Sequence, residues 1–167
     1  AMDKILKNPY EKFKVTRGDV NRDFLTLKEI QKIEKNRITI ERLRIVRDIF
    51  VFACYTGLSY SDIAKLSYQH IHKGDDDEDW IIIDRNKKNN RCRIPILPGA
   101  LKILRKYKDY AAWNESNGLL LPVRSNQRMN SYLKELADIC KIKKNLSMHG
   151  CQTFVCNYGY TCQWSSD

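Results

Sequence analysis

The strongest pattern in the chain is a pair of helical apolar repeats that meet at a short polar segment, YTGLSYSDIAKL, over residues 55–66. Gly57 is typical of a helix end, and Ser59 followed by Asp62 is typical of a helix start. The spacing therefore predicts a helix over residues 40–55, a tight corner and then a second helix. The positions that we expect the first helix to bury are Leu43, Val46, Ile49, Phe50 and Ala53.

The corner between these helices has two interpretations. Backbone N–H groups at a helix start, with short hydroxyl side chains beside them, form a natural site for a phosphate. The same pattern also describes an ordinary connection between two helices. Physical considerations alone favour the ordinary connection.

Capping and turn signals predict three further helices. Thr26 and Glu29 form a capping box, which predicts a helix over residues 27–34. Pro98 suits the first turn of a helix that we expect to end near Ala112. The last helix starts at Ser125, and its expected apolar face consists of Met129, Leu133, Leu136, Ala137 and Cys140.

The middle of the chain predicts a small antiparallel sheet. Residues 69–72 read as a short strand, and residues 80–83 and 91–97 read as a hairpin around a basic loop. The turn before this hairpin carries four adjacent carboxylates, but it lacks the spaced ligands of a calcium-binding loop, so a solvated turn is favoured. These carboxylates are Asp75, Asp76, Asp77 and Glu78. The expected fold is mainly α-helical with a small antiparallel β-hairpin or three-stranded sheet (α+β).

Charge and cysteine content narrow the functional classes. The 167 residues include 30 Lys and Arg against 20 Asp and Glu, a formal net charge of +10, which favours a polyanionic partner. No run of about 18 apolar residues and no signal peptide is present, so we expect a soluble, cytoplasmic protein without membrane contact. Cys54, Cys92 and Cys140 read as reduced core thiols. Arg42, Arg44 and Arg47 read as a solvated face rather than a DNA contact.

The first 23 residues show little periodicity and are interpreted as a linker. Ala1 ahead of Met2 is typical of a cloning remnant. We expect residues 24–150 to form one domain and residues 151–167 to form an aberrant tail.

The corner closely resembles the first catalytic box of tyrosine recombinases, the integrases of phages and conjugative elements, in its pattern T-G-L-x-x-S-D-[IVL]. In most of that family an arginine that clamps the scissile phosphate follows T-G-L, whereas this chain has Ser59. Asp62 matches the acidic position of the box, which supports the site. The resemblance implies a partial recombinase catalytic domain, incomplete at its C-terminal end, with residues 8–10 in the linker before it.

Two further stretches carry the same resemblance. The hairpin is similar to the family's lysine hairpin, in which Lys87, by its spacing to Pro95, matches the lysine that protonates the departing 5′ oxygen. Lys88 is the alternative if the register shifts by one residue. The simpler interpretation is that the basic hairpin residues hold phosphates or protect a sheet edge. The residues that the resemblance marks as DNA contacts are Lys88, Arg91, Arg93, Arg124, Asn126, Gln127 and Arg128.

His149, in the stretch L-S-M-H, matches the histidine of the third box, although a lone histidine at a helix start is more often a cap or a packed ring. The arginine expected three residues later is replaced by Gln152. Tyr158 and Tyr160 lie too near the third box to match the family's nucleophile, so both read as structural.

The tail from Cys151 onward has three explanations. It is a divergent natural end, a zinc site, or a frame-shifted reading of the third box. No paired C-x-x-C spacing supports the zinc site, whose four ligands would be His149, Cys151, Cys156 and Cys162. A frame shift is our hypothesis, because codons for the tail can be chosen so that the shifted frame reads A-R-H-S-F, which is the missing motif.

Two functions from different classes remain open. The first is a fragment of a site-specific DNA recombinase that breaks and rejoins DNA through a 3′-phosphotyrosyl intermediate, with the nucleophile absent from this chain and the chain itself inactive. The resemblance then implies double-stranded DNA and other recombinase protomers as partners, and no metal or nucleotide cofactor. The second is a non-catalytic helical module that binds DNA or another partner.

Overall fold

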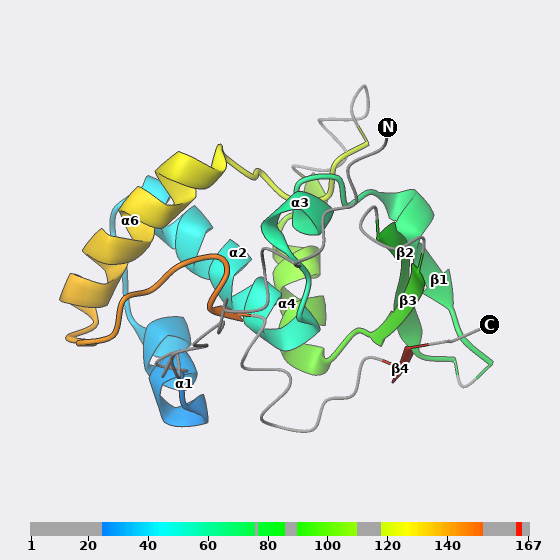
Figure 1. Ribbon diagram of the computed structural model, residues 1–167, viewed down its shortest axis with the longest axis horizontal. Coiled ribbons are helices and arrows are strands. Elements are labelled where there is room, and N and C mark those ends of the chain that lie inside the picture. The colour runs from blue at the N-terminus through cyan, green and yellow to red at the C-terminus, as the bar shows by residue number, and fades with distance from the viewer. Residues whose placement is uncertain (1–24, 76, 86–89, 110–117, 152–162, 165–167) are drawn as a thin grey trace, which may run out of the picture.

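The molecule consists of several helices and one small antiparallel sheet (Figure 1). The computed structural model describes residues 25–75, 77–85, 90–109, 118–151 and 163–164. Figure 1 shows the sheet at one end, α1, α2 and α6 at the other, and α4 between them. The helices are α1 (Leu27–Lys35), α2 (Glu41–Thr56), α3 (Tyr60–Ile63), α4 (Pro98–Lys106) and α6 (Asn126–Ile139), with a short 3₁₀ helix, η1 (Tyr68–His70). Helices α1, α2 and α6 confirm the predicted bounds to within one or two residues. The helix expected to run from Pro98 to near Ala112 instead ends at Lys106, because Tyr107 leaves the helical conformation, with φ −100° and ψ 14°.

The sheet has four antiparallel strands in the order β1-β2-β3-β4. One face of the β2–β3 pair is buried, because Ile81 lies opposite Ile94 and Ile83 lies opposite Cys92. The alternate positions, where Asp84 lies opposite Arg91, form the outer face. The strands are β1 (Ile71–Lys73), β2 (Asp79–Arg85), β3 (Asn90–Pro95) and β4 (Gln163–Trp164). The mainly helical fold with a small antiparallel sheet is confirmed, and β4 was not predicted.

The strand expected at residues 69–72 begins two residues later. The N–H of His70 donates to the carbonyl of Ser67 at 3.1 Å and closes the 3₁₀ turn of η1, while the N–H of Ser67 donates to Nδ1 of His70 at 3.1 Å and caps it. The strand starts only after that turn, at Ile71. The acidic turn that follows has Asp75, Asp77 and Glu78 exposed, as a solvated turn requires.

Helix α2 lies at the centre of the core and packs against α1, α4 and α6. The five positions predicted to face inward are all buried. Val51, Phe52 and Cys54 are buried as well, so the helix is enclosed on nearly all sides. The predicted core thiols Cys54, Cys92 and Cys140 are indeed buried and free.

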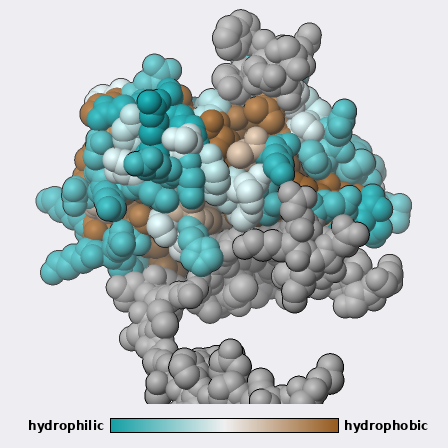
Figure 2. Space-filling model, turned by 45° about the horizontal axis from the view of Figure 1, so that its top comes forward, coloured by the Kyte–Doolittle hydropathy of each residue, from teal (hydrophilic) through white to brown (hydrophobic). Residues whose placement is uncertain are grey.

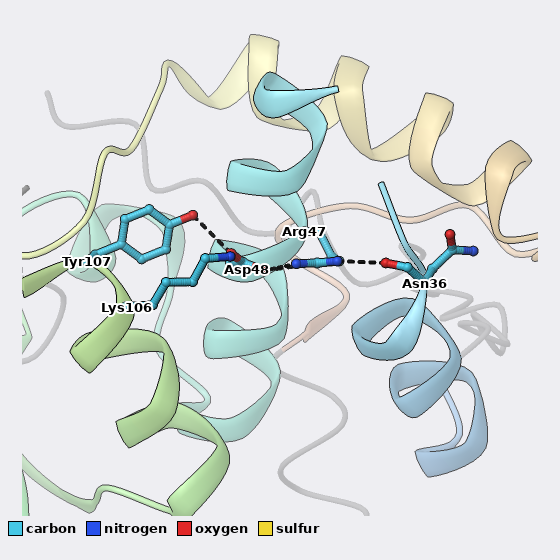
Figure 3. A network of polar contacts seen from close by, with 5 residues as sticks. All are labelled: Asn36, Arg47, Asp48, Lys106 and Tyr107. Carbon is cyan, nitrogen blue, oxygen red and sulfur yellow. Dashed lines mark hydrogen bonds and ion pairs between the residues drawn. The ribbon is translucent and has the colours of Figure 1, made fainter. Parts of the chain in front are cut away.

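One carboxylate of α2, Asp48, is buried at 6% exposure and binds groups from two helices (Figure 3). It accepts hydrogen bonds from Arg47 at 2.7 and 2.9 Å, from Lys106 and from the hydroxyl of Tyr107 at 3.0 Å. Arg47 also donates to the carbonyl oxygen of Asn36 at 2.7 Å. This network fastens the end of α4 and the residue after α1 to α2.

The solvated face predicted for the α2 arginines holds only in part. Arg44 is exposed. Arg47 belongs to the Asp48 network, and Arg42 pairs with Glu135 of α6 at 2.8 Å and lies over the ring of Tyr132. Two of the three arginines therefore bind α2 to its neighbours.

Helix α4 approaches α2 closely at a glycine. A Cβ atom at Gly99 would lie 2.6 Å from Cε2 of Tyr55. The Tyr55 hydroxyl donates to Glu34 at 3.0 Å, which fixes the ring against that position. The absence of a side chain at residue 99 thus sets the spacing of the two helices.

Hydrophilic residues cover much of the described surface on the face in Figure 2, and hydrophobic residues appear in smaller patches between them. Among the described residues, no helix combines the length and the apolar character needed to cross a membrane.

Candidate nucleic-acid interface

The corner after α2 is closed by its own side chains. Gly57 has the left-handed φ of +67° that a helix end of this type needs, and its N–H donates to the carbonyl of Ala53. Ser59 caps α3, because its Oγ accepts from the N–H of Asp62 at 3.3 Å. In return, the Asp62 carboxylate accepts from the N–H of Ser59 at 3.2 Å and from its hydroxyl at 2.7 Å. The side chains of Ser59 and Asp62 therefore already accept hydrogen bonds from backbone N–H groups that a phosphate at the corner would need.

Replacing Ser59 by alanine is expected to lower the free energy of unfolding by about 1 kcal/mol, because the first turn of α3 loses its cap. Chemical denaturation measures this loss. Ser61→Ala is the matched control: Ser61 is exposed, and although its hydroxyl lies 2.8 Å from the Ser59 hydroxyl, its loss leaves the bonds between Ser59 and Asp62 in place, so its effect should stay within about 0.5 kcal/mol. Equal effects of the two substitutions would show that the box does not stabilise the corner.

A cleft of about 400 Å³ lies between the corner and the sheet. It brings together Asp62 of the corner and Arg91 of the hairpin, two predicted site residues from distant parts of the sequence. Both polar and apolar groups line it. The complete lining is Asp62, Lys65, Gln69, His70, His72, Ile82, Ile83, Asp84 and Arg91.

The start of α6 lies beside the corner. The hydroxyl of Tyr60, the first residue of α3, donates to the carbonyl oxygen of Arg124 at 2.9 Å. The predicted DNA contacts on this segment, Arg124, Asn126, Gln127 and Arg128, are all exposed. The bond at Tyr60 thus holds the corner and the basic start of α6 together.

The segment that carries His149 and resembles the third box contacts both α6 and α2, close to the corner. The side chain of Asn130 accepts from the N–H of Met148 at 2.9 Å and donates to Asn126 at 3.2 Å. Burial raises the pKa of the Cys54 thiol well above its usual value, and the neighbouring Cys151 thiol, itself fully buried, raises it further. Cys54 belongs to the last turn of α2, so the segment that carries His149 packs next to the helix that leads into the corner. His149 itself is exposed, not packed.

Two solved structures share this arrangement of elements. A crystal structure of XerA recombinase aligns with a TM-score of 0.60 and 16% sequence identity, over 80% of this chain and 49% of that chain. A pre-cleavage complex of XerH site-specific recombinase bound to its difH substrate aligns with a TM-score of 0.61 and 14% identity, over 89% of this chain and 47% of that chain. The chain has a tyrosine recombinase fold. It spans about half the length of each of these recombinases.

Sequence comparison adds no relative, since neither a protein-family model nor a curated protein sequence matches the chain. At 14–16% identity the likeness to the recombinases concerns the fold. The roles assigned to single residues remain predictions.

Some predicted site residues are not brought to the cleft. Arg93 lines a separate hollow of about 450 Å³ with Trp80 on the outer face of the sheet. The predicted catalytic Lys87 and its neighbour Lys88 lie outside the described residues, as do Gln152, Tyr158 and Tyr160.

Four residues in and around the cleft were not found from the sequence. Lys65 and His70 line the cleft, and Tyr60 and Asn130 tie the three segments together. Of these four, only Lys65 could have been found from the sequence, because it follows Asp62 by about one helical turn and so falls on the same side of the predicted helix. The bonds of Tyr60 and Asn130 reach 64 and 18 residues along the chain and leave no local pattern.

Within the described part of the chain, no group of three or more His, Cys, Asp or Glu side chains is placed to hold a metal ion. Two of the four ligands in the zinc interpretation, Cys156 and Cys162, lie outside that part. Cys151 is fully buried, and its thiol donates to the carbonyl of Met148 at 2.7 Å.

Proposed function

We propose that this chain is a DNA-binding part of a site-specific recombinase of the integrase type, acting on double-stranded DNA. The proposal rests on one observation. Three segments that resemble the family's motifs are far apart in the sequence, yet the corner, the hairpin residue Arg91 and the His149 segment meet around the end of α2. The net charge of +10 and the exposed basic start of α6 fit a polyanionic partner.

In the proposed reaction, a tyrosine attacks a DNA phosphate and forms a 3′-phosphotyrosyl link, which conserves the energy of the broken bond for rejoining. Lys87 would protonate the departing 5′ oxygen, and His149 would stabilise the phosphate. Asp62 would hold the corner in place. The attacking tyrosine has no match in this sequence, so we propose that the chain binds DNA without cleaving it and that a longer protein or other protomers complete the reaction.

Duplex affinity is expected to fall steeply with salt, because phosphate contacts displace condensed counterions. The logarithmic slope should be about 0.9 per phosphate neutralised, with little preference for sequence. Fluorescence anisotropy with labelled duplexes of two unrelated sequences, each at a series of salt concentrations, measures the slope and the preference together. Absence of binding at low salt would contradict the proposal.

The second candidate is a DNA-binding module that does no chemistry. The closed box at Ser59 favours it, because the position of the phosphate-clamping arginine is occupied by a short side chain whose hydroxyl is bonded to Asp62. The two candidate functions differ in whether a covalent protein–DNA product forms. A recombinase that includes this chain and a tyrosine nucleophile leaves protein covalently attached to the 3′ end of a nicked strand, whereas a module leaves only reversible complexes.

A further inference from the structure

Two cations in the cleft beside the corner form no ion pair with any residue that the structure describes. Lys65 follows α3 and Arg91 belongs to β3, and both are exposed. In the described part of the chain neither forms an ion pair, whereas Arg47, Lys106 and Lys144 each do. Charged groups that face a shared cleft without a counter-ion are placed to bind an anion.

The two carboxylates of the cleft leave this charge available. Asp62 accepts hydrogen bonds from the N–H and the hydroxyl of Ser59. Asp84 lies opposite Arg91 in the strand register, but it is exposed and forms no ion pair within the described residues. An anion that reaches both Lys65 and Arg91 would therefore displace neither cation from a partner among the described residues.

His70 adds a hydrogen-bond donor to the cleft, and its hydrogen bonds within the protein determine which ring nitrogen is that donor. The backbone N–H of Ser67 donates to Nδ1 of His70, so in the neutral ring the hydrogen must be on Nε2. His70 lines the cleft, and the only polar hydrogen that its neutral ring can offer is the one on Nε2. A neutral donor suits a singly charged phosphate diester, which accepts hydrogen bonds at its oxygens.

We propose that this cleft binds a backbone phosphate of duplex DNA, held by Lys65 and Arg91 with a hydrogen bond from His70. This inference rests on the proposed function and places the phosphate beside the corner rather than on it. The corner lacks a cation, since residues 57–62 read GLSYSD, and its cap already uses the N–H groups of Ser59 and Asp62. The positive charge comes from the next turn of chain and from the hairpin.

The double variant Lys65→Gln/Arg91→Gln tests this site, and it is compared with a control variant that loses the same charge elsewhere on the surface. We expect it to lower the logarithmic salt slope for a labelled duplex by about 1.8, the value for two cationic contacts at about 0.9 each. The control is Lys102→Gln/Arg105→Gln, which removes two exposed cations of α4 outside the cleft. The control should change the slope by less than half as much.

His70→Asp tests the donor separately. Aspartate keeps an acceptor for the N–H of Ser67 and so preserves the turn, as Asp62 does for Ser59, but it lacks the Nε2 donor and brings a negative charge to the cleft. We expect the midpoint of thermal unfolding to stay unchanged and duplex affinity to fall by about tenfold or more. Unchanged affinity would overturn the role of His70.

The results separate the two proposals. If the unmodified protein does not bind duplex DNA at low salt, the proposed function fails. If it binds, but the cleft variant and the α4 variant change the slope equally, the cleft proposal fails and the proposed function stands.

Discussion

Replacing Asp48 by alanine is expected to lower the free energy of unfolding by about 3 kcal/mol, at the lower end of the range for breaking a buried ion pair. The loss arises from the groups left behind. Arg47 has a side chain only 13% exposed, so it would lose its counter-ion while still enclosed, and Tyr107 would lose its hydrogen-bond partner. Lys106 is 45% exposed and can regain water, which limits the cost. Urea unfolding followed by circular dichroism measures the change.

Asp138→Ala is the control for this substitution, because Asp138 is an exposed carboxylate on α6 with no ion pair in the described residues. Its effect should stay within about 0.5 kcal/mol. Tyr107→Phe should fall between the two, at about 1 kcal/mol, because it removes one hydrogen bond and leaves both ion pairs. A loss below 1 kcal/mol for Asp48→Ala would mean that the network does not hold α4 against α2.

Gly99→Ala is expected to lower the free energy of unfolding by about 2 kcal/mol, although alanine ordinarily favours a helix over glycine. The new Cβ atom would meet the Tyr55 ring at 2.6 Å, so α4 or the ring must move. The ring cannot move freely because its hydroxyl is bonded to Glu34 on α1. Thermal or chemical unfolding measures the loss.

A double-mutant cycle with Tyr55→Leu isolates the clash. Removing the ring should make Gly99→Ala nearly neutral or slightly stabilising, since only the helix preference of alanine then remains. If Gly99→Ala costs the same in both backgrounds, the close approach of the ring is not the cause.

The fold was largely predictable because its signals are local. The Thr26–Glu29 capping box, Gly57 at a helix end and Ser59 at a helix start are each read within four residues, and the structure confirms each of them. Strand β3 alternates in hydropathy because the sheet buries one face, whereas β2 carries the continuous apolar run of residues 80–83. The 3₁₀ turn η1 was missed because a histidine ring at its third position accepts from the N–H of Ser67, a role more common for glutamate or glutamine.

The buried polar network and the cleft were not predictable, because their partners are distant in the sequence. Asp48 meets Lys106 and Tyr107 across 58 and 59 residues, and nothing near Asp48 marks it as buried. Lys65 and Arg91 likewise share a cleft only after the sheet has formed. The frame-shift hypothesis for residues 151–167 stays a prediction, which the encoding DNA would decide. The structure describes Cys151, Gln163 and Trp164 of that segment, with the last two paired to β3.

The thiols of Cys54 and Cys151 give the domain a built-in probe of local opening. Both are fully buried where the third-box segment packs against the last turn of α2, and burial raises the pKa of Cys54 well above its usual value. A maleimide or iodoacetamide reacts with a thiolate that it can reach, so these sites should be inert while the contact is closed. Their rate of alkylation in native buffer therefore reports how often the His149 segment lifts away from the helix that supports the corner.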